Sequence, residues 1–204
     1  AERTDPMEGV ELVGDKIAVL YKETAVSRLR VFDRAGKELG EVKLPTFGSI
    51  SAVSSEPGSA KMVFAFSSFL YAPSLFTVDV DESLSAAPFE MTPIGDAFSP
   101  EDYEVKYVEY PSYDGEFIPL FIAAKKGVKL DGSNRTILKG YGGFSISYGP
   151  YFSRSTLFWI QRGGVIAVAG LRGGSEKGEK WHEAGMLDKK YQVLQDFQYA
   201  MRYL

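Results

Sequence analysis

Short apolar runs separated by turn residues fill the first hundred positions of the chain. Four of these runs, at residues 10–13, 16–21, 28–32 and 39–44, are rich in β-branched or aromatic residues, or alternate apolar with polar positions. Such runs are typical of strands. Four more follow at residues 49–53, 62–66, 75–80 and 89–92. Two groups of four strands, spaced by about 40 residues, match the blade repeat of a β-propeller; a sandwich of about eight strands has the same pattern.

The pattern changes at residues 93–100, where P-I-G-D-A-F-S-P is typical of a linker. Residues 104–109 and 116–123 follow as two strands joined across S-Y-D-G, which indicates a hairpin. We therefore divide the chain into residues 1–98, the propeller part, and residues 99–204. Two blades alone do not close a propeller and leave exposed sheet edges, so residues 1–98 are predicted to be an incomplete β-propeller.

The second part contains two short apolar strands, at residues 135–139 and 165–169, and each ends in a glycine cluster. Residues 153–162 between them have helical spacing. This order of strand, helix and strand predicts a parallel α/β sheet with ligand-facing loops at the carboxyl ends of its strands. Because glycines let the backbone approach a ligand closely, we place a candidate site near Tyr141.

The last segment, residues 191–204, predicts an amphipathic helix. Its apolar face would consist of Tyr191, Leu194, Phe197, Met201 and Leu204. Asp188 and Asp196 fall on the other face, where the pattern assigns them no special role.

Composition excludes several classes of function. The 204 residues are 45% hydrophobic and 25% charged, which is typical of a globular protein. A net charge of −4 argues against a nucleic-acid partner, and no apolar run approaches the roughly 20 residues of a membrane-spanning helix. The absence of cysteine excludes disulfides and thiolate chemistry without fixing the compartment. We expect no cofactor, and a cytoplasmic location, or a periplasmic one if the full-length protein has a signal peptide.

Several familiar site patterns are absent or incomplete. G-Y-G-G at residues 140–143 resembles a dinucleotide-binding fingerprint, but Ser145 replaces its third glycine and Pro150 interrupts the helix that should follow. His182 is the only histidine, so no metal site of the H-E-x-x-H type exists. The nucleophile motif G-x-S-x-G is absent as well, and Ser175 in the nearest match is interpreted as a loop serine.

Three segments together resemble the prolyl oligopeptidase family of serine peptidases. They are Y-P-S-Y-D-G-E-F-I-P-L-F-I-A-A-K-K-G-V-K-L-D-G-S at residues 110–133, G-Y-G-G-F at residues 140–144, and R-G-G-S-E-K-G-E-K-W-H at residues 172–182. The resemblance implies two blades of a seven-bladed propeller, followed by the first part of an α/β-hydrolase domain. It also implies hydrolysis of short peptides after proline by Ser-His-Asp acyl transfer, without metal or cofactor.

The resemblance assigns roles to individual residues. Tyr141 would donate its hydroxyl to the oxyanion, and Phe144 would line the pocket for the substrate's proline ring; without the resemblance, both would be interpreted as packing residues. His182 does not match the family's catalytic histidine. The triad would lie beyond Leu204, so the chain alone is expected to be inactive and to require the remainder of the same polypeptide.

Arg172 has two candidate roles: binding a substrate carboxylate, or bracing its loop on a carboxylate such as Glu176 or Glu179. We favour bracing. Two alternatives to prolyl specificity stay open: a non-catalytic peptide- or protein-binding module, and a related acylaminoacyl-peptidase or oligopeptidase-B-like specificity. A reading frame that continues into G-x-S-x-G, Asp and His would separate the enzyme from the binding module.

Overall fold

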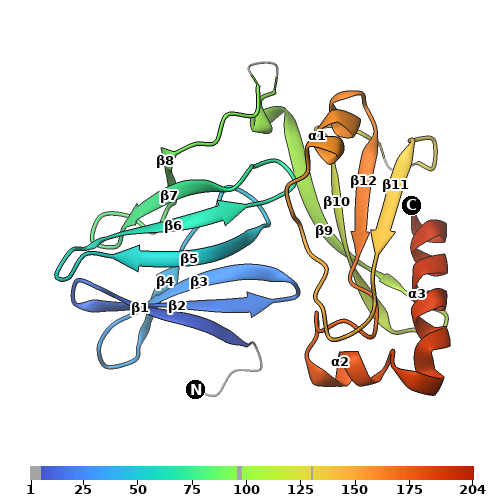
Figure 1. Ribbon diagram of the computed structural model, residues 1–204, viewed down its shortest axis with the longest axis horizontal. Coiled ribbons are helices and arrows are strands. Elements are labelled where there is room, and N and C mark those ends of the chain that lie inside the picture. The colour runs from blue at the N-terminus through green and yellow to red at the C-terminus, as the bar shows by residue number, and fades with distance from the viewer. Residues whose placement is uncertain (1–5, 96–97, 130) are drawn as a thin grey trace.

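The computed structural model describes residues 6–95, 98–129 and 131–204, which form three four-stranded sheets (Figure 1). The first two sheets are antiparallel and follow the order of the chain. The first sheet consists of β1 (Met7–Val13), β2 (Lys16–Glu23), β3 (Val26–Phe32) and β4 (Glu38–Glu41). The second consists of β5 (Ser49–Ser55), β6 (Lys61–Ser67), β7 (Ser74–Asp79) and β8 (Ala87–Glu90).

These two sheets share one apolar core. Along β6, the buried side chains of Met62, Phe64 and Phe66 alternate with partly buried ones, as the period of a strand requires. They pack in the same cluster as Leu29 and Val31 of the first sheet. Each four-stranded unit thus buries one face against its neighbour, which is the arrangement predicted for consecutive propeller blades.

The third sheet has the order β11-β12-β10-β9 and mixed direction. Its strands are β9 (Tyr103–Pro111), β10 (Phe117–Lys125), β11 (Thr136–Gly140) and β12 (Val165–Ala169). Only β11 and β12 are parallel, connected through α1 (Arg154–Gln161). The predicted parallel pair joined by a helix is therefore confirmed for β11 and β12, and the predicted hairpin is confirmed for β9 and β10, which pair antiparallel across the tight turn at residues 112–116.

Strand alternation gives the third sheet two buried faces. Ile118, Leu120 and Ile122 of β10 pack in the cluster that contains Val193 of α3 (Lys190–Tyr203). Phe121 and Ala123 face the opposite side, where they pack with α1 and with Ala25, Val26, Phe69 and Leu70 of the blades. Figure 1 accordingly shows the blades on one side of this sheet and α3 on the other.

The contact with the blades also includes aromatic rings. Phe47 lies 6.2 Å from Tyr107 and 6.0 Å from Phe121, measured between ring centroids. Phe98 stacks on Tyr103 at 4.8 Å, next to the short helix η1 (Pro100–Asp102). Asp96 and Ala97 of the predicted linker lie outside the described residues, and the boundary between residues 98 and 99 stays a prediction.

The buried face of α3 differs from the predicted one. Tyr191, Leu194 and Met201 are exposed, whereas the buried side chains are Val193, Asp196 and Ala200. Phe197 and Leu204 are partly buried, as expected. The helix is rotated relative to the prediction. Asp196, which the apolar pattern placed on the outer face, is buried. Among the described residues, no helix is both long and apolar enough to cross a membrane.

Candidate active site

The loop that follows β11, residues 140–151, is named here the tyrosine loop. It holds two exposed aromatic side chains, Tyr141 at 47% and Phe144 at 83% of their full accessibility, with ring centroids 6.5 Å apart. Within the described part of the chain, no hydrogen bond engages the Tyr141 hydroxyl. A phenol donor and an apolar ring therefore lie side by side, both accessible, at the carboxyl end of a strand.

The backbone of the tyrosine loop is held in an unfavourable conformation. Phe144 and Ser145 both have left-handed φ angles, 53° and 55°, which for residues with a side chain cost on the order of 1–3 kcal/mol each. Gly142 has a φ of 62°, and a Cβ there would lie 2.4 Å from Cγ1 of Val193, so only glycine fits. Such strain persists only where the surroundings impose it, and it concentrates at functional sites.

The surroundings that impose it belong mainly to the loop after β12, residues 170–178, named here the arginine loop. The amide of Ser145 donates to the carbonyl of Gly173 at 3.2 Å. The hydroxyls of Ser147 and Ser175 are 2.9 Å apart. The amide of Tyr148 donates to Oε1 of Glu176 at 2.8 Å. These three contacts fix successive points of the tyrosine loop on the arginine loop.

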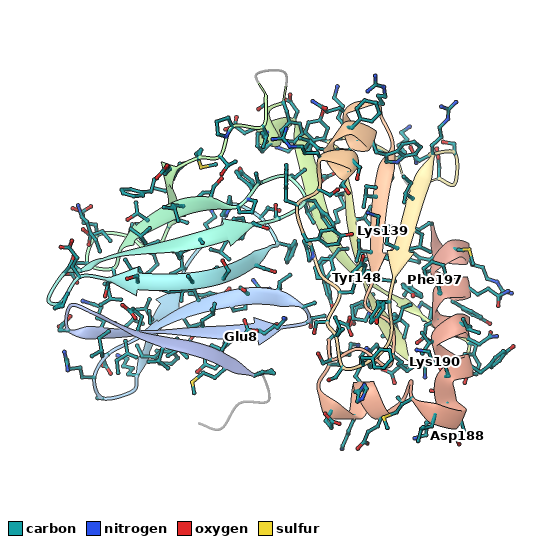
Figure 2. All side chains as sticks on the ribbon, viewed as in Figure 1. Glu8, Lys139, Tyr148, Asp188, Lys190 and Phe197 are labelled. Carbon is teal, nitrogen blue, oxygen red and sulfur yellow. The ribbon has the colours of Figure 1, made fainter. Side chains whose placement is uncertain are left out.

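A further contact comes from α3. The ammonium group of Lys190 donates to the carbonyl of Gly142, and Figure 2 shows Lys190 in the lower part of that helix. On the other side, Tyr148 and Phe152 pack against the cluster that includes blade residues. The tyrosine loop is thus held by the arginine loop, by α3 and by the blades.

Arg172 braces the base of the site, as predicted, but its carboxylate partners are not the predicted ones. Its Nε and Nη2 donate to the two carboxylate oxygens of Asp196 at 2.9 and 2.5 Å, and its Nη1 donates to Asp114 at 2.6 Å. Neither Glu176 nor Glu179 bonds to it within the described residues. Since Arg172 is 4% exposed and Asp196 is fully buried, this pair is not available to a substrate carboxylate.

The network continues into the β9–β10 hairpin. Ser112 donates to Asp196 Oδ1 at 2.6 Å, and the Tyr110 hydroxyl donates to the Asp196 carbonyl at 2.8 Å. Burial acts to raise the pKa of Asp114, but the hydrogen bond from Arg172, the hydrogen bond from the Glu116 amide and the charge of Arg172 together outweigh burial, and the pKa is lowered. The expectation that Asp196 has no role is therefore wrong, because it neutralises an arginine 24 positions earlier in the chain.

Glu176 is the second buried charge-bearing group in the arginine loop. Burial raises its pKa to about 7, although the hydrogen bond from the Tyr148 amide and the charge of Lys22 both act to lower it. Its Oε2 atom is buried without a hydrogen-bond partner among the described residues. The carboxyl group thus stays protonated up to about pH 7 while Oε1 still accepts from the Tyr148 amide.

Replacing Glu176 with glutamine is expected to remove a pH dependence of stability. Since the pKa is raised from 4.5 to about 7 on folding, the wild-type contribution is complete below about pH 4.5 and is lost as the pH rises through 7. The loss is on the order of 3 kcal/mol. Glutamine stays neutral and keeps the acceptor for Tyr148, so Glu176→Gln should unfold at a higher temperature than wild type at pH 8, with little difference at pH 5.

Thermal unfolding at both pH values checks this expectation. Glu179→Gln is the matched control, because Glu179 is an exposed glutamate three positions later. Equal pH dependence of wild type and Glu176→Gln would contradict the interpretation of Glu176 as a neutral buried acid.

Two tyrosines near the site, Tyr148 and Tyr151, were not predicted. The hydroxyls of Tyr148 and Tyr151 are 3.0 Å apart, and Lys139 Nζ lies 3.4 Å from the Tyr151 hydroxyl. The hydrogen bond from Tyr148 lowers the pKa of Tyr151, while the same bond raises the pKa of Tyr148 to about 12. Lys139 and Tyr148 are labelled in Figure 2. The sequence offers only a weak signal for them, namely two tyrosines on either side of Gly-Pro.

Ser175, which was interpreted as a loop serine, and His182, which does not match the family's catalytic histidine, both have defined contacts. Ser175 is half-buried and engaged with Ser147. His182 lies on the short helix α2 (Glu179–Glu183), which the pattern had not indicated, with Nδ1 2.8 Å from the carbonyl of Gly173. Within the residues that the structure describes, no group of three or more His, Asp or Glu side chains is arranged to hold a metal ion.

Comparison with known proteins relates this geometry to a family. The model of the prolyl oligopeptidase N-terminal beta-propeller domain matches residues 1–87, and the model of the prolyl oligopeptidase family matches residues 150–204. The curated prolyl endopeptidase of Elizabethkingia miricola is 37% identical over 204 residues, which is all of this chain and 28% of that protein. Prolyl oligopeptidase A of Amanita bisporigera is 32% identical over 93% of the chain and 25% of its own length.

Solved structures give the same result. A structure from a mechanistic study of two prolyl endopeptidases matches all of this chain and 29% of its own, with a TM-score of 0.92 and 39% identity. Prolyl oligopeptidase B from Galerina marginata matches with a TM-score of 0.90 and 28% identity, again over 29% of its length.

These matches confirm the predicted combination of propeller blades with part of an α/β-hydrolase domain, and they leave the roles of individual residues untested. The chain spans about 28% of the length of the curated prolyl endopeptidases it matches. It belongs to the prolyl oligopeptidase family, and it carries propeller blades and the start of the peptidase domain.

Proposed function

We propose that this chain is part of a serine peptidase that hydrolyses short peptides on the carboxyl side of proline. The observation that carries the proposal is the braced tyrosine loop, which holds the free hydroxyl of Tyr141 beside the exposed ring of Phe144. Relatives over the whole chain are prolyl endopeptidases, and a structure of the Galerina marginata enzyme contains a 35-residue hydrolysis and macrocyclization substrate. We extend peptide substrates to this protein on that basis.

The proposed chemistry is acyl transfer. A serine hydroxyl attacks the carbonyl carbon of the proline residue while histidine accepts its proton, and the carbonyl oxygen becomes an oxyanion. Tyr141 donates a hydrogen bond to that oxygen, and Phe144 forms one wall of the pocket for the proline ring. Since the chain spans 28% of its relatives, we place the Ser-His-Asp triad in the rest of the polypeptide, which is the necessary partner of this part.

Hydrolysis of matched peptides tests the proposal. The complete peptidase, and separately the 204-residue chain, are incubated with a fluorogenic peptide that has proline before the scissile bond and with the same peptide carrying alanine there. We expect turnover by the complete peptidase with preference for proline, and none by the chain alone. Failure of the complete peptidase to cleave the proline peptide would refute the proposal. Cellular fractionation tests the accompanying proposal of a cytoplasmic location, or a periplasmic one behind a signal peptide.

Replacing Phe144 with alanine is expected to lower kcat/KM for the proline peptide by about 10- to 100-fold, since a lost apolar contact costs about 1–3 kcal/mol. The alanine peptide has no ring to bind there, so its kcat/KM should change less. Ile146→Ala is the matched control, because Ile146 is an exposed apolar residue of the same loop. Equal losses for both peptides would show that Phe144 does not contribute to proline selectivity.

A further inference from the structure

Three atoms meet where the strained turn of the tyrosine loop joins the arginine loop. Nδ1 of His182 lies 2.8 Å from the carbonyl oxygen of Gly173 and 3.1 Å from the amide nitrogen of Ser145. The same Ser145 amide is 3.2 Å from the Gly173 oxygen. Ser145 directly follows Phe144, and both have left-handed backbone angles. His182 therefore contacts the strained turn formed by Phe144 and Ser145.

Nδ1 of His182 can donate to the Gly173 oxygen at 2.8 Å or accept from the Ser145 amide at 3.1 Å. The contact with oxygen is the shorter one, and without a proton it would set two lone pairs against each other. We therefore assign the proton of His182 to Nδ1, which donates it to Gly173. The Ser145 amide donates to the same oxygen, which has two lone pairs. The Gly173 carbonyl is the shared acceptor that connects α2 with the strained turn.

Gly173 is itself held on both sides by α2. Its amide donates to the carbonyl of Trp181 at 2.9 Å, and its carbonyl accepts from the ring of His182. Trp181 is 5% exposed, and its indole nitrogen donates to the carbonyl of Leu171 at 3.1 Å. The tryptophan anchors α2 to the arginine loop without help from the histidine. Loss of the imidazole should therefore leave α2 in place and remove only the hydrogen bond from the ring to the Gly173 carbonyl, which then keeps the Ser145 amide as its donor.

We propose that His182 is a positioning residue for the proposed peptidase reaction, and that it acts on Tyr141 and Phe144 through the Gly173 carbonyl and the Ser145 amide. The inference rests on the proposed function of the tyrosine loop. It assigns to the histidine neither proton transfer nor contact with substrate. Without its hydrogen bond the left-handed turn at residues 144–145 relaxes, and the Tyr141 hydroxyl moves away from the developing oxyanion.

Side-chain geometry supplies a conservative variant. The amide nitrogen of asparagine is bonded to Cγ, as Nδ1 of histidine is, so it can donate at the same place. The amide of glutamine is one bond further out and overshoots the Gly173 oxygen. His182→Asn should therefore retain function and His182→Gln should lose it, although both residues are polar amides.

The test is a double-mutant cycle in the complete peptidase with the proline peptide. His182→Gln is expected to lower kcat by about 10- to 100-fold, with KM within about twofold of wild type, and His182→Asn to stay within about threefold. Because the effect of the histidine on kcat runs through Tyr141, the kcat of Tyr141→Phe combined with His182→Gln should be no lower than that of Tyr141→Phe alone. Glu183→Gln, an exposed neighbour on α2, is the control.

Each other outcome has a defined meaning. Wild-type kcat in His182→Gln, an equal loss in His182→Asn, or multiplication of the two losses in the double variant would overturn the positioning role. If Tyr141→Phe alone keeps wild-type kcat, the assignment of Tyr141 as the oxyanion donor fails. If His182→Gln lowers kcat in that case, the histidine acts on another group, and the inference is overturned as well. Should His182→Gln not fold, His182→Ser, whose side chain is too short to reach Gly173, replaces it in the same cycle.

Discussion

Tyr141→Phe in the complete peptidase is expected to lower kcat by about 10²–10³-fold, or about 3–4 kcal/mol of transition-state stabilisation, with little change in KM. The hydroxyl has no hydrogen-bond partner among the described residues, so phenylalanine leaves no partner unsatisfied. The ring keeps its neighbours, Phe144 at 6.5 Å and Tyr148 at 6.4 Å between centroids. The substitution therefore removes a donor and very little packing.

The kinetic signature follows from when the hydrogen bond forms. The substrate carbonyl is a weak acceptor, whereas the tetrahedral oxyanion is a strong one, so the contribution of Tyr141 arises mainly in the transition state. Steady-state kinetics with the proline and alanine peptides measure it, and kcat should fall by a similar factor for both. Tyr191→Phe, at an exposed tyrosine of α3, is the control. Wild-type kcat in Tyr141→Phe would make it a packing residue.

The strands of this protein were predictable because local chemistry determines them. Turn residues bound each strand, and β12 occupies the predicted residues Val165–Ala169. The position of the tyrosine loop was also predictable, since a glycine cluster after a strand places a loop at the sheet edge. The exposure of Phe144 and the left-handed φ angles at residues 144–145 were not predictable. They depend on contacts with the arginine loop, which lies 28 or more positions further along the chain.

The helices show the same limit. The short α2 has no apolar period, and Trp181 fixes it by a bond to Leu171. The buried face of α3 was predicted wrongly. The apolar spacing of Tyr191, Leu194 and Met201 indicated that these side chains are buried, and nothing in the pattern indicated that Asp196 is buried instead. A buried carboxylate is favourable only with a partner, and the partner of Asp196 lies in another loop. Sequence periodicity carries no information about such pairing.

That pairing leads to the largest stability effect we expect. Asp196→Ala should destabilise the protein by about 3–5 kcal/mol, the usual cost of removing one member of a buried ion pair. Arg172 is 4% exposed and would keep its charge. Asp114 bonds to it at 2.6 Å, but the side chain of Asp114 is 32% exposed and its attraction is partly screened by water. The Ser112 hydroxyl would lose its acceptor as well.

Denaturant unfolding of the complete protein, followed by hydrogen exchange in the segments that contain residues 172 and 196, measures this loss. Asp188→Ala, an exposed acid two positions before the start of α3, should change stability by less than about 0.5 kcal/mol. Arg172→Met together with Asp196→Ala removes both charges, so the double variant should be more stable than Asp196→Ala alone. A double variant that is less stable than either single variant would contradict this expectation. It would show that the two side chains stabilise the site by packing and by hydrogen bonds to other groups, and that neutralisation of Arg172 is not the reason Asp196 is buried.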